Sequence, residues 1–498
     1  MKEEHEGSYH HILKYTGIFG GVQGLNTLIG LVRNKIVAYL LGPAGMGLVS
    51  LFNTTVNFIS QATNLGISFS AVRHVSELFD SGDEARITHF IKVVRAWCLL
   101  TGLIGMLVCM LAGPLLSSFT FTWGDHTRHF ILLAPAVGLL AVAGGETAIL
   151  KGARQLKSLA MIQVYAVFIA LFISVPIYYF FGQSGIVPVI VLMALSSLLL
   201  TIRYSYRLYP LKLKGAKGIL GEGMEMVRLG VSFIVAGILG SGAEMLIRSY
   251  LNTHGDLDVV GLYNAGYMLT MIYGGMVFSA METDFFPRLS AVSRDVSQAN
   301  LTVNRQIEVS VLLIGPLLVL MLFGAPLLIP LLFTNEFIPV VDMMRFTTLA
   351  LYLRAMKLPV CYMALARGDG RAYLLLEAVF DVAMVVGVIL GYQWWGLTGT
   401  GIALLCVSLL DYVIVHAYTI WRYHYHPTAS VLTYGGIQIL LGVVSLVLIY
   451  NLGGICYWAA AVVMTLLSLC YSLHVLRQKT HLWAKLKLKF KRRFTRHE

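Results

Sequence analysis

Charged residues are scarce in this chain: Asp, Glu, Lys and Arg make up only 12% of its 498 residues. A soluble domain usually carries about 25% charged residues, because its surface must be hydrated. Apolar residues make up 57% of the chain, and the mean hydropathy is +0.75. This scarcity of charge excludes a soluble globular protein and indicates an integral membrane protein.

The chain also lacks long hydrophilic segments between its apolar runs, since each connecting stretch is short. Such loops have no room for a nucleotide-binding domain or for a large outer domain that would house a glycan polymerase site. The glycine-rich stretch GEGMEM (221–226) lacks the lysine of a phosphate-binding loop, and GPAGMG (42–47) lies at an outer junction between apolar runs. We therefore do not expect ATP to drive this protein.

Cysteine is rare, and all six cysteines fall inside apolar runs rather than in outer loops. We expect no structural disulfide, and no pair has the spacing of zinc ligands. The histidines of WRYHYHP (421–427) are interpreted as interfacial side chains rather than metal ligands. Residues 1–13 are polar and rich in acids, so we expect no cleavable signal peptide. We expect no cofactor.

What the chain does have is a series of long apolar runs. A bilayer core about 30 Å thick needs roughly 20 apolar residues per helix. The length and glycine content of the runs favour helices over a barrel, whose strands would be near ten residues long. The sequence predicts an all-α polytopic membrane protein with 14 transmembrane helices. The approximate spans are 14–41, 46–71, 92–114, 129–150, 158–181, 185–208, 228–251, 259–285, 307–333, 343–366, 372–392, 397–420, 431–451 and 454–476.

The distribution of positive charge predicts the orientation. With the N-terminus inside, most of the 37 Lys and Arg fall in inner segments, and the outer loops hold at most Arg128 and Arg345. Because positive residues gather on the cytoplasmic side of membrane proteins, we expect cytoplasmic N- and C-termini. This topology explains the net charge of +12, which therefore does not indicate nucleic-acid binding.

An internal repeat divides the chain. Three motifs recur at offsets of 216, 215 and 214 residues: AILKGARQ (148–155) as ALARGDGR (364–371), LVRNK (31–35) as LIRSY (246–250), and GL (47–48) as GL (261–262). A duplicated bundle predicts two pseudo-symmetric six-helix lobes with a central substrate path. The predicted domains are an N-terminal lobe (1–213), a C-terminal lobe (214–427), helices 13 and 14 (428–476) and a basic cytoplasmic tail (477–498). Because two halves already build a full path, we expect a monomer.

Three cations lie near the outer ends of spans 1 and 7: Arg33, Lys35 and Arg248. A charge inside the bilayer costs roughly 2.5–3.5 kcal/mol on insertion scales, so it usually faces protein or water. Arg33 and Arg248 are repeat equivalents that we expect to face each other across the axis between the halves. With Lys35 they predict a site for a multiply charged anion, because a guanidinium pairs bidentately with phosphate or carboxylate. The alternatives are snorkelling to outer headgroups and, for Arg248, an i,i+4 pair with Glu244.

Span 10 carries the deepest cations, Arg354 and Lys357, which are three residues apart and share a helix face. We predict that they line the cavity. Acids inside the spans are concentrated in the second half, with Glu377 and Asp381 on span 11 and Asp411 on span 12, and the matching positions of the first half carry no acid. They are candidates for cation or proton coupling. The alternative is that they neutralise the two cations of span 10.

Charges at the inner ends of spans form a further group, which we interpret as gate or interface residues: Glu146, Glu282, Asp284 and Arg288. The basic tail, HLWAKLKLKFKRRFTRHE (481–498), alternates with period two and is not a good amphipathic helix. We interpret it as a tail attracted to anionic lipid of the inner leaflet.

The fourteen spans, two repeats and additional C-terminal pair resemble the multidrug/oligosaccharidyl-lipid/polysaccharide exporter superfamily. Within it, RNKIVAYLLGPAGMGLVSLF (33–52) is similar to the Wzx-type flippases of O-antigen and enterobacterial common antigen. Those proteins carry a Lys in span 1 seven residues before a similar GPAGxG turn, here Lys35 before Gly42. Arg248 in span 7 and the KG turn at 151–152 also resemble theirs.

The resemblance implies a V-shaped pair of lobes in the bacterial cytoplasmic (inner) membrane. It implies alternating access that moves undecaprenyl-pyrophosphate-linked oligosaccharide to the outer leaflet, for O-antigen, capsule or exopolysaccharide. We expect the pyrophosphate to bind Arg33, Lys35 and Arg248, with Arg354 and Lys357 as further ligands that it meets before them. The resemblance also implies that spans 13 and 14 form a groove for the lipid tail. Related lipid II flippases have a sodium site with an acid on span 11, a role that Asp381 or Glu377 would fill. Whether a proton or a sodium gradient drives the transport cycle stays open. Polysaccharide polymerase machinery is a candidate partner protein.

Two other function classes stay open. A cation-coupled multidrug exporter of the same superfamily would need acids and aromatics in the cavity, whereas the predicted cavity charges are mostly basic. A membrane glycan polymerase, which is an enzyme, would need a large outer loop or a His-Asp pair at the membrane face. Dye efflux and glycan chain length are the observations that separate these classes from a flippase.

Overall fold

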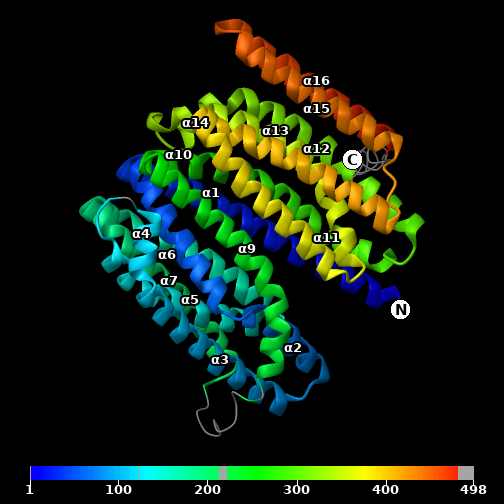
Figure 1. Cartoon of the computed structure of the whole chain (residues 1–498). Helices are drawn as coiled ribbons and strands as arrows, with labels where there is room; N and C mark the ends of the chain where they lie inside the picture. The colour runs from blue at the N-terminus through cyan, green and yellow to red at the C-terminus, as the bar shows by residue number, and fades with distance from the viewer. Residues whose placement is uncertain (1, 122, 212–220, 222, 480–498) are drawn as a thin grey trace, which may run out of the picture. The chain divides into compact units, whose positions relative to one another are not determined.

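Only helices and turns occur in the part of the chain that the computed structural model describes, which is residues 2–121, 123–211, 221 and 223–479 (Figure 1). A helix satisfies all of its backbone hydrogen bonds internally, so it is the form that long apolar runs take in lipid. The predicted all-α class is confirmed.

The first helices follow the apolar runs of the first half and the start of the second. They are α1 (Lys2–Thr63), α2 (Ile67–Ser81), α3 (Glu84–Leu111), α4 (Gly113–Thr120), α5 (Thr127–Gly152), α6 (Leu156–Phe181), the 3₁₀ helix η1 (Gly182–Gly185), α7 (Ile186–Leu208), α9 (Met224–His254) and α10 (Leu257–Tyr267).

The remaining helices begin with a π-helix that continues α10 without a break. They are η2 (Met268–Gly274), α11 (Gly275–Val292), α12 (Val296–Leu332), the 3₁₀ helix η3 (Asn335–Val340), α13 (Val341–Ala366), α14 (Gly370–Tyr423), α15 (Ala429–Asn451) and α16 (Gly454–Lys479).

The structure supports the predicted number of spans. Within the described residues, 9 helical stretches are long and apolar enough to cross a membrane. Three of them, Gly24–Thr63, Lys157–Leu208 and Gly370–Tyr423, each contain two predicted spans joined at a glycine. These stretches therefore hold twelve spans, and α9 with the run from α10 to α11 occupies the other two, which confirms the fourteen-helix architecture.

Two of these junctions share an unusual backbone conformation at repeat-equivalent positions. Gly182 follows two phenylalanines and has φ 55° and ψ −134°, and Gly396, 214 residues later, follows two tryptophans and has φ 59° and ψ −142°. Gly42 breaks α1 with φ 64° and ψ −174°. Only glycine adopts this region readily, because a Cβ would clash with the backbone. These glycines let two spans follow each other with no loop.

The chain packs as two compact units. Unit 1 contains residues 1–264 and 330–337, and unit 2 contains residues 265–329 and 338–498. α9 and most of α10 therefore pack with the helices of the first half. The lobes predicted at 1–213 and 214–427 are the two copies of the repeat and are not the same segments as these two units. Their bounds stay a prediction.

Unit 1 brings the two copies of the GL motif into contact. A Cβ on Gly47 would lie 2.1 Å from the carbonyl oxygen of Leu257, and a Cβ on Gly261 would lie 2.0 Å from the carbonyl oxygen of Pro43. Both glycines and both carbonyls are related by the 214-residue offset. Equivalent residues that touch each other lie on the local two-fold axis of the repeat, so the contact between α1 and α10 marks that axis inside unit 1.

Unit 2 holds the C-terminal hairpin, in which α15 and α16 run side by side (Figure 1). Gln438 on α15 is 0% exposed, donates to Ser472 Oγ at 2.8 Å and accepts from Ser468 Oγ at 2.7 Å. Inter-helical hydrogen bonds of this kind hold helices together in lipid. Gly442 lets α15 approach Tyr352 of α13.

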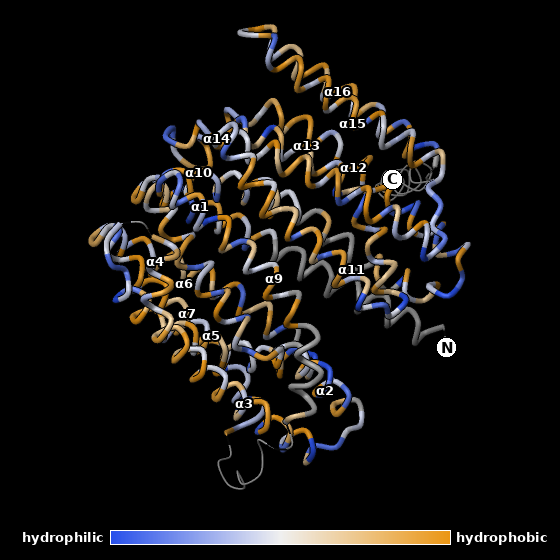
Figure 2. Tube along the Cα trace, in the orientation of Figure 1, coloured by the Kyte–Doolittle hydropathy of each residue, from blue (hydrophilic) through white to orange (hydrophobic). Residues whose placement is uncertain are grey.

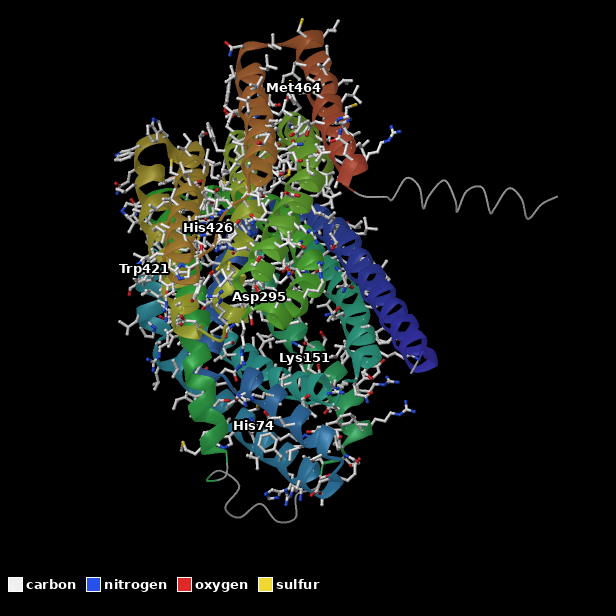
Figure 3. The ribbon with its side chains drawn as sticks, turned by 90° about the vertical axis from the view of Figure 1, so that its right-hand side faces the viewer. His74, Lys151, Asp295, Trp421, His426 and Met464 are labelled. Atoms are coloured by element: carbon white, nitrogen blue, oxygen red, sulfur yellow. The ribbon has the colours of Figure 1, made fainter. Side chains whose placement is uncertain are left out.

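The polar and apolar residues are distributed as a membrane requires. Figure 2 shows apolar residues along the helices and hydrophilic residues at several of their ends. Within unit 1, His74 of α2 and Lys151 at the end of α5 lie toward the same end (Figure 3). Both residues belong to segments that the charge distribution predicts to be inner.

Candidate functional site

Unit 2 contains a charged cavity of about 330 Å³, which we call the Lys357 cavity. Its walls come from the end of α10, the π-helix η2, α13 and both halves of α14. Its lining residues are Tyr267, Met271, Arg354, Lys357, Leu358, Tyr362, Tyr373, Glu377, Phe380, Met384, Leu404, Ser408 and Asp411. Two cations and two carboxylates of predicted spans 10, 11 and 12 therefore line one cavity.

The ammonium group of Lys357 is bound by both carboxylates. Its Nζ lies 2.9 Å from Asp411 Oδ2 and 3.7 Å from Glu377 Oε1. It also lies 5.3 Å from the centre of the Phe380 ring, within the range of a cation–π interaction. The Lys357 side chain is 11% exposed, and that of Asp411 is 9% exposed. Neutralisation of a deep cation by acids of α14, the alternative that the sequence left open, is what the structure shows for Lys357.

Arg354 lies one helical turn from Lys357 and contacts the π-helix. A terminal guanidinium nitrogen donates to the carbonyl oxygen of Met271 at 3.1 Å. A π-helix shifts the backbone hydrogen bonds of a helix by one residue and often occurs at functional sites. The third acid predicted here, Asp381, is half-buried on α14 and is not among the described residues that line the cavity.

Unit 1 contains a second cavity of about 320 Å³, the Arg33 cavity, between α1, α5, α6 and α7. Its polar lining comes from Arg33, Asn53, Asn57, Tyr178, Ser196 and Ser197. Asn53 and Asn57 are one turn apart on the second half of α1 and share its cavity face. The offset of 214 relates them to Tyr267 and Met271 of the Lys357 cavity, so the duplication places a cavity at equivalent positions of both halves.

The guanidinium of Arg33 contacts α6 and α7. Its Nε donates to Ser174 Oγ at 3.3 Å, and a terminal nitrogen lies 3.8 Å from Met193 Sδ. The Ser174 hydroxyl in turn donates to the carbonyl of Ala170 at 2.6 Å. Arg33 is therefore held at the wall of its cavity by α6 and α7.

Lys35 has a different environment, although it is only two residues from Arg33. Its ammonium donates to the carbonyl oxygens of Pro330 and Phe333 at the C-terminal end of α12. The last carbonyls of a helix have no partner within the helix and carry partial negative charge, so a lysine there stabilises the helix end. The structure gives Lys35 the role of a helix cap within unit 1.

Arg248 lies at the two-fold axis of the repeat and is only 4% exposed. Its Nε donates to Ser50 Oγ at 2.8 Å, and its terminal nitrogens donate to Asn264 Oδ1 at 3.2 Å and Glu244 Oε2 at 3.3 Å. Ser50 also donates to Asn264 at 2.9 Å, and these two residues are equivalent by the 214-residue offset. The pair with Glu244, an alternative left open by the sequence, is present.

The predicted gate residues fall into two groups. Glu146 of α5 is 1% exposed and forms a bidentate ion pair with Arg95 of α3, at 2.7 and 3.2 Å. Ser205 of α7 donates to the same carboxylate at 2.5 Å, so three helices of unit 1 are joined there. Arg288 is exposed on α11. The side chains of Glu282 and Asp284 lie outside the described part of the structure.

Several polar residues of both cavities were not predicted, chiefly Asn53, Asn57, Tyr178 and Tyr267. The stretch NTTVN (53–57) was a usable signal, because two amides one turn apart are unusual in an apolar span. The aromatic side chains carried no such signal, since tyrosine is common in membrane helices. The π-helix also has no signature in the sequence.

Comparisons with known proteins fit this architecture. The model of a family described as polysaccharide biosynthesis protein matches residues 36–342. The lipid III flippase of Escherichia coli (strain K12) is 22% identical over 371 residues, which cover 72% of this chain and 86% of that protein.

Solved structures share the fold at low sequence identity. Lipid II flippase MurJ in an inward closed conformation has a TM-score of 0.68 and 12% identity, over 92% of this chain and 99% of that one. An inward-facing multidrug resistance MATE family transporter of the MOP superfamily has a TM-score of 0.66 and 17% identity, over 80% of this chain and 94% of that one. The predicted exporter fold is confirmed.

Proposed function

This chain belongs to the polysaccharide biosynthesis protein family, and we propose from that premise that it is a flippase for lipid-linked oligosaccharide. It is a multi-pass membrane transporter and not an enzyme. In the proposed reaction, undecaprenyl-pyrophosphate-linked oligosaccharide moves from the inner to the outer leaflet of the bacterial cytoplasmic membrane, for O-antigen, capsule or exopolysaccharide. No covalent bond changes, and the substrate site is open alternately to the two sides of the membrane.

The observation that carries the proposal is the Lys357 cavity. Arg354 and Lys357 place two cations in one cavity inside the spanning helices, where an anion finds partners that lipid does not offer. Pyrophosphate has several strong acceptor oxygens and binds both guanidinium and ammonium groups. We therefore assign the pyrophosphate to Arg354 and Lys357. The sequence also predicted Lys35 and Arg248 as pyrophosphate ligands. In the structure Lys35 caps the C-terminal end of α12, and Arg248 is buried at the two-fold axis of the repeat.

The same cavity suggests how an ion is coupled to transport. A pyrophosphate that binds Lys357 competes with Asp411 and Glu377 for the same ammonium. A buried carboxylate that loses its counter-charge favours uptake of a proton or a cation. Outward movement of an anion across an inside-negative potential is favourable by about 2.3 kcal/mol per charge per 100 mV, so the bound ion is needed only to reset the carrier.

The remaining assignments concern the surroundings of the site. The termini are proposed to be cytoplasmic, and the protein is proposed to act as a monomer. The basic tail is proposed to contact anionic lipid of the inner leaflet, and polysaccharide polymerase machinery is a candidate partner. Residues 480–498 of the tail lie outside the described part of the structure. Glu146 with its partner Arg95, together with Glu282, Asp284 and Arg288, is proposed to stabilise the inner gate region.

The test is transport in proteoliposomes that contain lipid-linked oligosaccharide, with a membrane-impermeant enzyme reporting arrival in the opposite leaflet. Lys357→Gln removes a charge-assisted contact and is expected to lower the rate by roughly tenfold or more. Asp411→Asn is expected to retain transport but to lose the dependence on a proton or sodium gradient. Arg73→Gln is the matched control, because Arg73 pairs with Glu77 at the surface with side-chain exposure of 68% and 57%.

Wild-type rates for Lys357→Gln, with unchanged ion dependence for Asp411→Asn, would show that the Lys357 cavity is not the transport site. A complete absence of transport by the wild-type protein in this assay would remove the flippase proposal itself.

A second function has one specific observation in its favour. The carboxylates Glu377 and Asp411 lie with Tyr267, Tyr362 and Phe380 in the Lys357 cavity, and acids with aromatics bind organic cations. A multidrug exporter is therefore the alternative. Ethidium efflux from a pump-deficient strain that expresses this chain, lost in Asp411→Asn, would favour it over the flippase.

A further inference from the structure

The turn between α13 and α14 contains one copy of the longest repeated motif, ALARGDGR (364–371). Gly368 has φ 76°, and the amide of Asp369 donates back to the carbonyl oxygen of Ala364 at 2.9 Å. One oxygen of the Asp369 carboxylate accepts from the amide of Ala372 at 3.2 Å and so caps α14. These local bonds fix the carboxylate of Asp369 on the turn.

Two other segments of unit 2 hold the side chains of this turn. The second oxygen of the Asp369 carboxylate accepts from the hydroxyl of Tyr423, at the end of α14, at 2.9 Å. The Nε of Arg367 donates to the carbonyl oxygen of Ser293, which follows α11, at 3.2 Å. The Arg367 guanidinium also lies 5.0 Å from the centre of the Tyr423 ring, within cation–π range. Arg367 is therefore held through its Nε and its planar face, and its terminal nitrogens are left for a further acceptor.

The same residues line an open cavity of about 450 Å³, which we call the Arg422 cavity. Its described lining is Arg367, Gly368, Asp369, Arg422 and Tyr423. Two guanidiniums and one carboxylate give this lining a net charge of +1. Because the two carboxylate oxygens accept from an amide and a hydroxyl, the arginines are not neutralised by an ion pair with Asp369. The lining is balanced by an anion that carries one charge and several acceptor oxygens.

The surroundings of the cavity indicate where that anion comes from. The charge distribution predicts that the end of α14 lies at the inner face of the membrane. Trp421, next to Arg422, is 75% exposed, and Ile420 is 40% exposed. Exposed tryptophan at the end of a spanning helix is typical of the level of the lipid headgroups. The singly charged anion at this level is the phosphate diester of a membrane lipid.

The first half of the chain lacks this arrangement. The offset of 215 relates Arg422 to Arg207, so both copies have an arginine at this helix end. The offset of 216 relates Asp369 to Ala153, whose side chain accepts no hydrogen bond. General attraction between basic residues and the inner leaflet explains the arginine in both copies. It does not explain the carboxylate that holds the end of α14 beside the turn in one copy only.

We propose that the Arg422 cavity binds the phosphate diester of an anionic membrane lipid such as phosphatidylglycerol. Arg367 and Arg422 bind the phosphate oxygens, and the acyl chains extend beside Ile420 and Trp421. Through Arg367 the bound lipid joins the end of α11 to the α13–α14 turn and to the end of α14, so it stabilises unit 2. This inference goes beyond the proposed flippase function and does not depend on it.

The experiment is native mass spectrometry of the purified full-length chain in detergent, which gives the apparent affinity for each added ligand. The ligands are phosphatidylglycerol, phosphatidylcholine with the same acyl chains, and inorganic phosphate. Wild type is expected to bind phosphatidylglycerol roughly tenfold more tightly than phosphatidylcholine, whose choline group is repelled by the arginines. Arg422→Gln is expected to remove this preference. Because Arg422 is exposed, this variant is expected to fold normally.

Three further variants make the result specific. Arg207→Gln removes an equal charge at the repeat-equivalent position, where the residue is also exposed, and is expected to keep the preference. Asp369→Asn keeps a capping side chain but removes the negative charge, so it is expected to tighten phosphatidylglycerol binding by roughly threefold. Tyr423→Phe frees one carboxylate oxygen to pair with the arginines and is expected to weaken binding by roughly the same factor.

A second measurement does not depend on the mass spectrum. Phosphatidylglycerol is expected to raise the unfolding temperature of wild type and of Arg207→Gln, but not that of Arg422→Gln, because a ligand stabilises the state that binds it.

Three results overturn the inference: equal affinity of wild type for the two lipids, an unchanged preference in Arg422→Gln, or an equal loss of preference in Arg207→Gln and Arg422→Gln. Inorganic phosphate that binds wild type as tightly as phosphatidylglycerol would show a site for free phosphate, and would also overturn it. None of these results bears on whether the protein transports lipid-linked oligosaccharide, so the inference fails separately from the proposed function.

Discussion

The contact between Gly47 and Gly261 offers the sharpest test of the structure, because two repeat-equivalent residues meet there. The perturbation is an added methyl group on either side of the axis. In Gly47→Ala the new Cβ would lie 2.1 Å from the Leu257 carbonyl oxygen and 3.0 Å from the Gly261 nitrogen. In Gly261→Ala it would lie 2.0 Å from the Pro43 carbonyl oxygen and 3.1 Å from the Gly47 nitrogen.

The magnitude follows from these distances. Carbon and oxygen in close contact are normally about 3.3 Å apart, so α1 and α10 must separate by more than about 1 Å. Overpacking of this kind costs about 1–3 kcal/mol. The separation also stretches the 2.9 Å hydrogen bond between Ser50 and Asn264, which hold the buried guanidinium of Arg248. Weakening bonds to a buried charge brings the expected loss to about 2–5 kcal/mol for each variant.

The assay is thermal unfolding of the purified chain in detergent, followed by tryptophan fluorescence. Each single variant is expected to unfold several degrees below wild type. The double variant is expected to resemble either single one, because one separation of the helices relieves both clashes. Gly436→Ala is the control, since a Cβ at that position on α15 meets nothing within 4 Å. Wild-type stability of the single variants, or fully additive losses in the double variant, would refute the contact.

Two further predictions concern stability, and both are read from the same unfolding assay. Arg95→Met or Glu146→Leu alone leaves a buried charge without its partner and is expected to lower the free energy of unfolding by about 3–5 kcal/mol. The double variant removes both charges and is expected to lose far less. A loss in the double variant as large as the sum of the two single losses would contradict this. Gly42→Ala and Gly396→Ala place a side chain where φ is 64° and 59°, and each is expected to cost about 1–3 kcal/mol, while Gly24→Ala in regular helix is neutral or stabilising. Equal behaviour of all three alanine variants would show that the breaks in α1 and α14 do not need glycine.

The fold followed from local properties of the sequence to a large extent. Apolar length predicts spans because each helix must satisfy its own backbone in lipid, whatever its neighbours are. The sequence predicted the repeat but not which of its equivalent residues touch. In the structure Gly47 packs on Gly261 and Ser50 bonds to Asn264. A two-fold relation between copies brings equivalent residues together only at its axis, and the position of that axis is decided by how the helices pack.

The site was predicted less completely. The clustering of Arg354, Lys357, Glu377 and Asp411 follows from their spacing on three predicted spans, and one cavity holds all four. The equivalence of Arg33 and Arg248 suggested equal roles, but Arg33 lines a cavity and Arg248 is buried at the axis. The residues around the two arginines differ between the copies. The conformation and burial of a side chain depend on the residues that it contacts, so equivalent positions in a repeat need not have equal roles.

The sequence by itself determined that this protein spans a membrane fourteen times, that its halves are related, and that its cations and acids lie inside the spanning helices. These properties depend on residues close together in the chain. Only the tertiary structure decided which charges share a cavity, and that Lys35 caps a helix end almost three hundred residues away. Such partners are chosen by how helices pack, because inside a bilayer the energy of a charge depends on the polar atoms within reach and not on its position in the sequence.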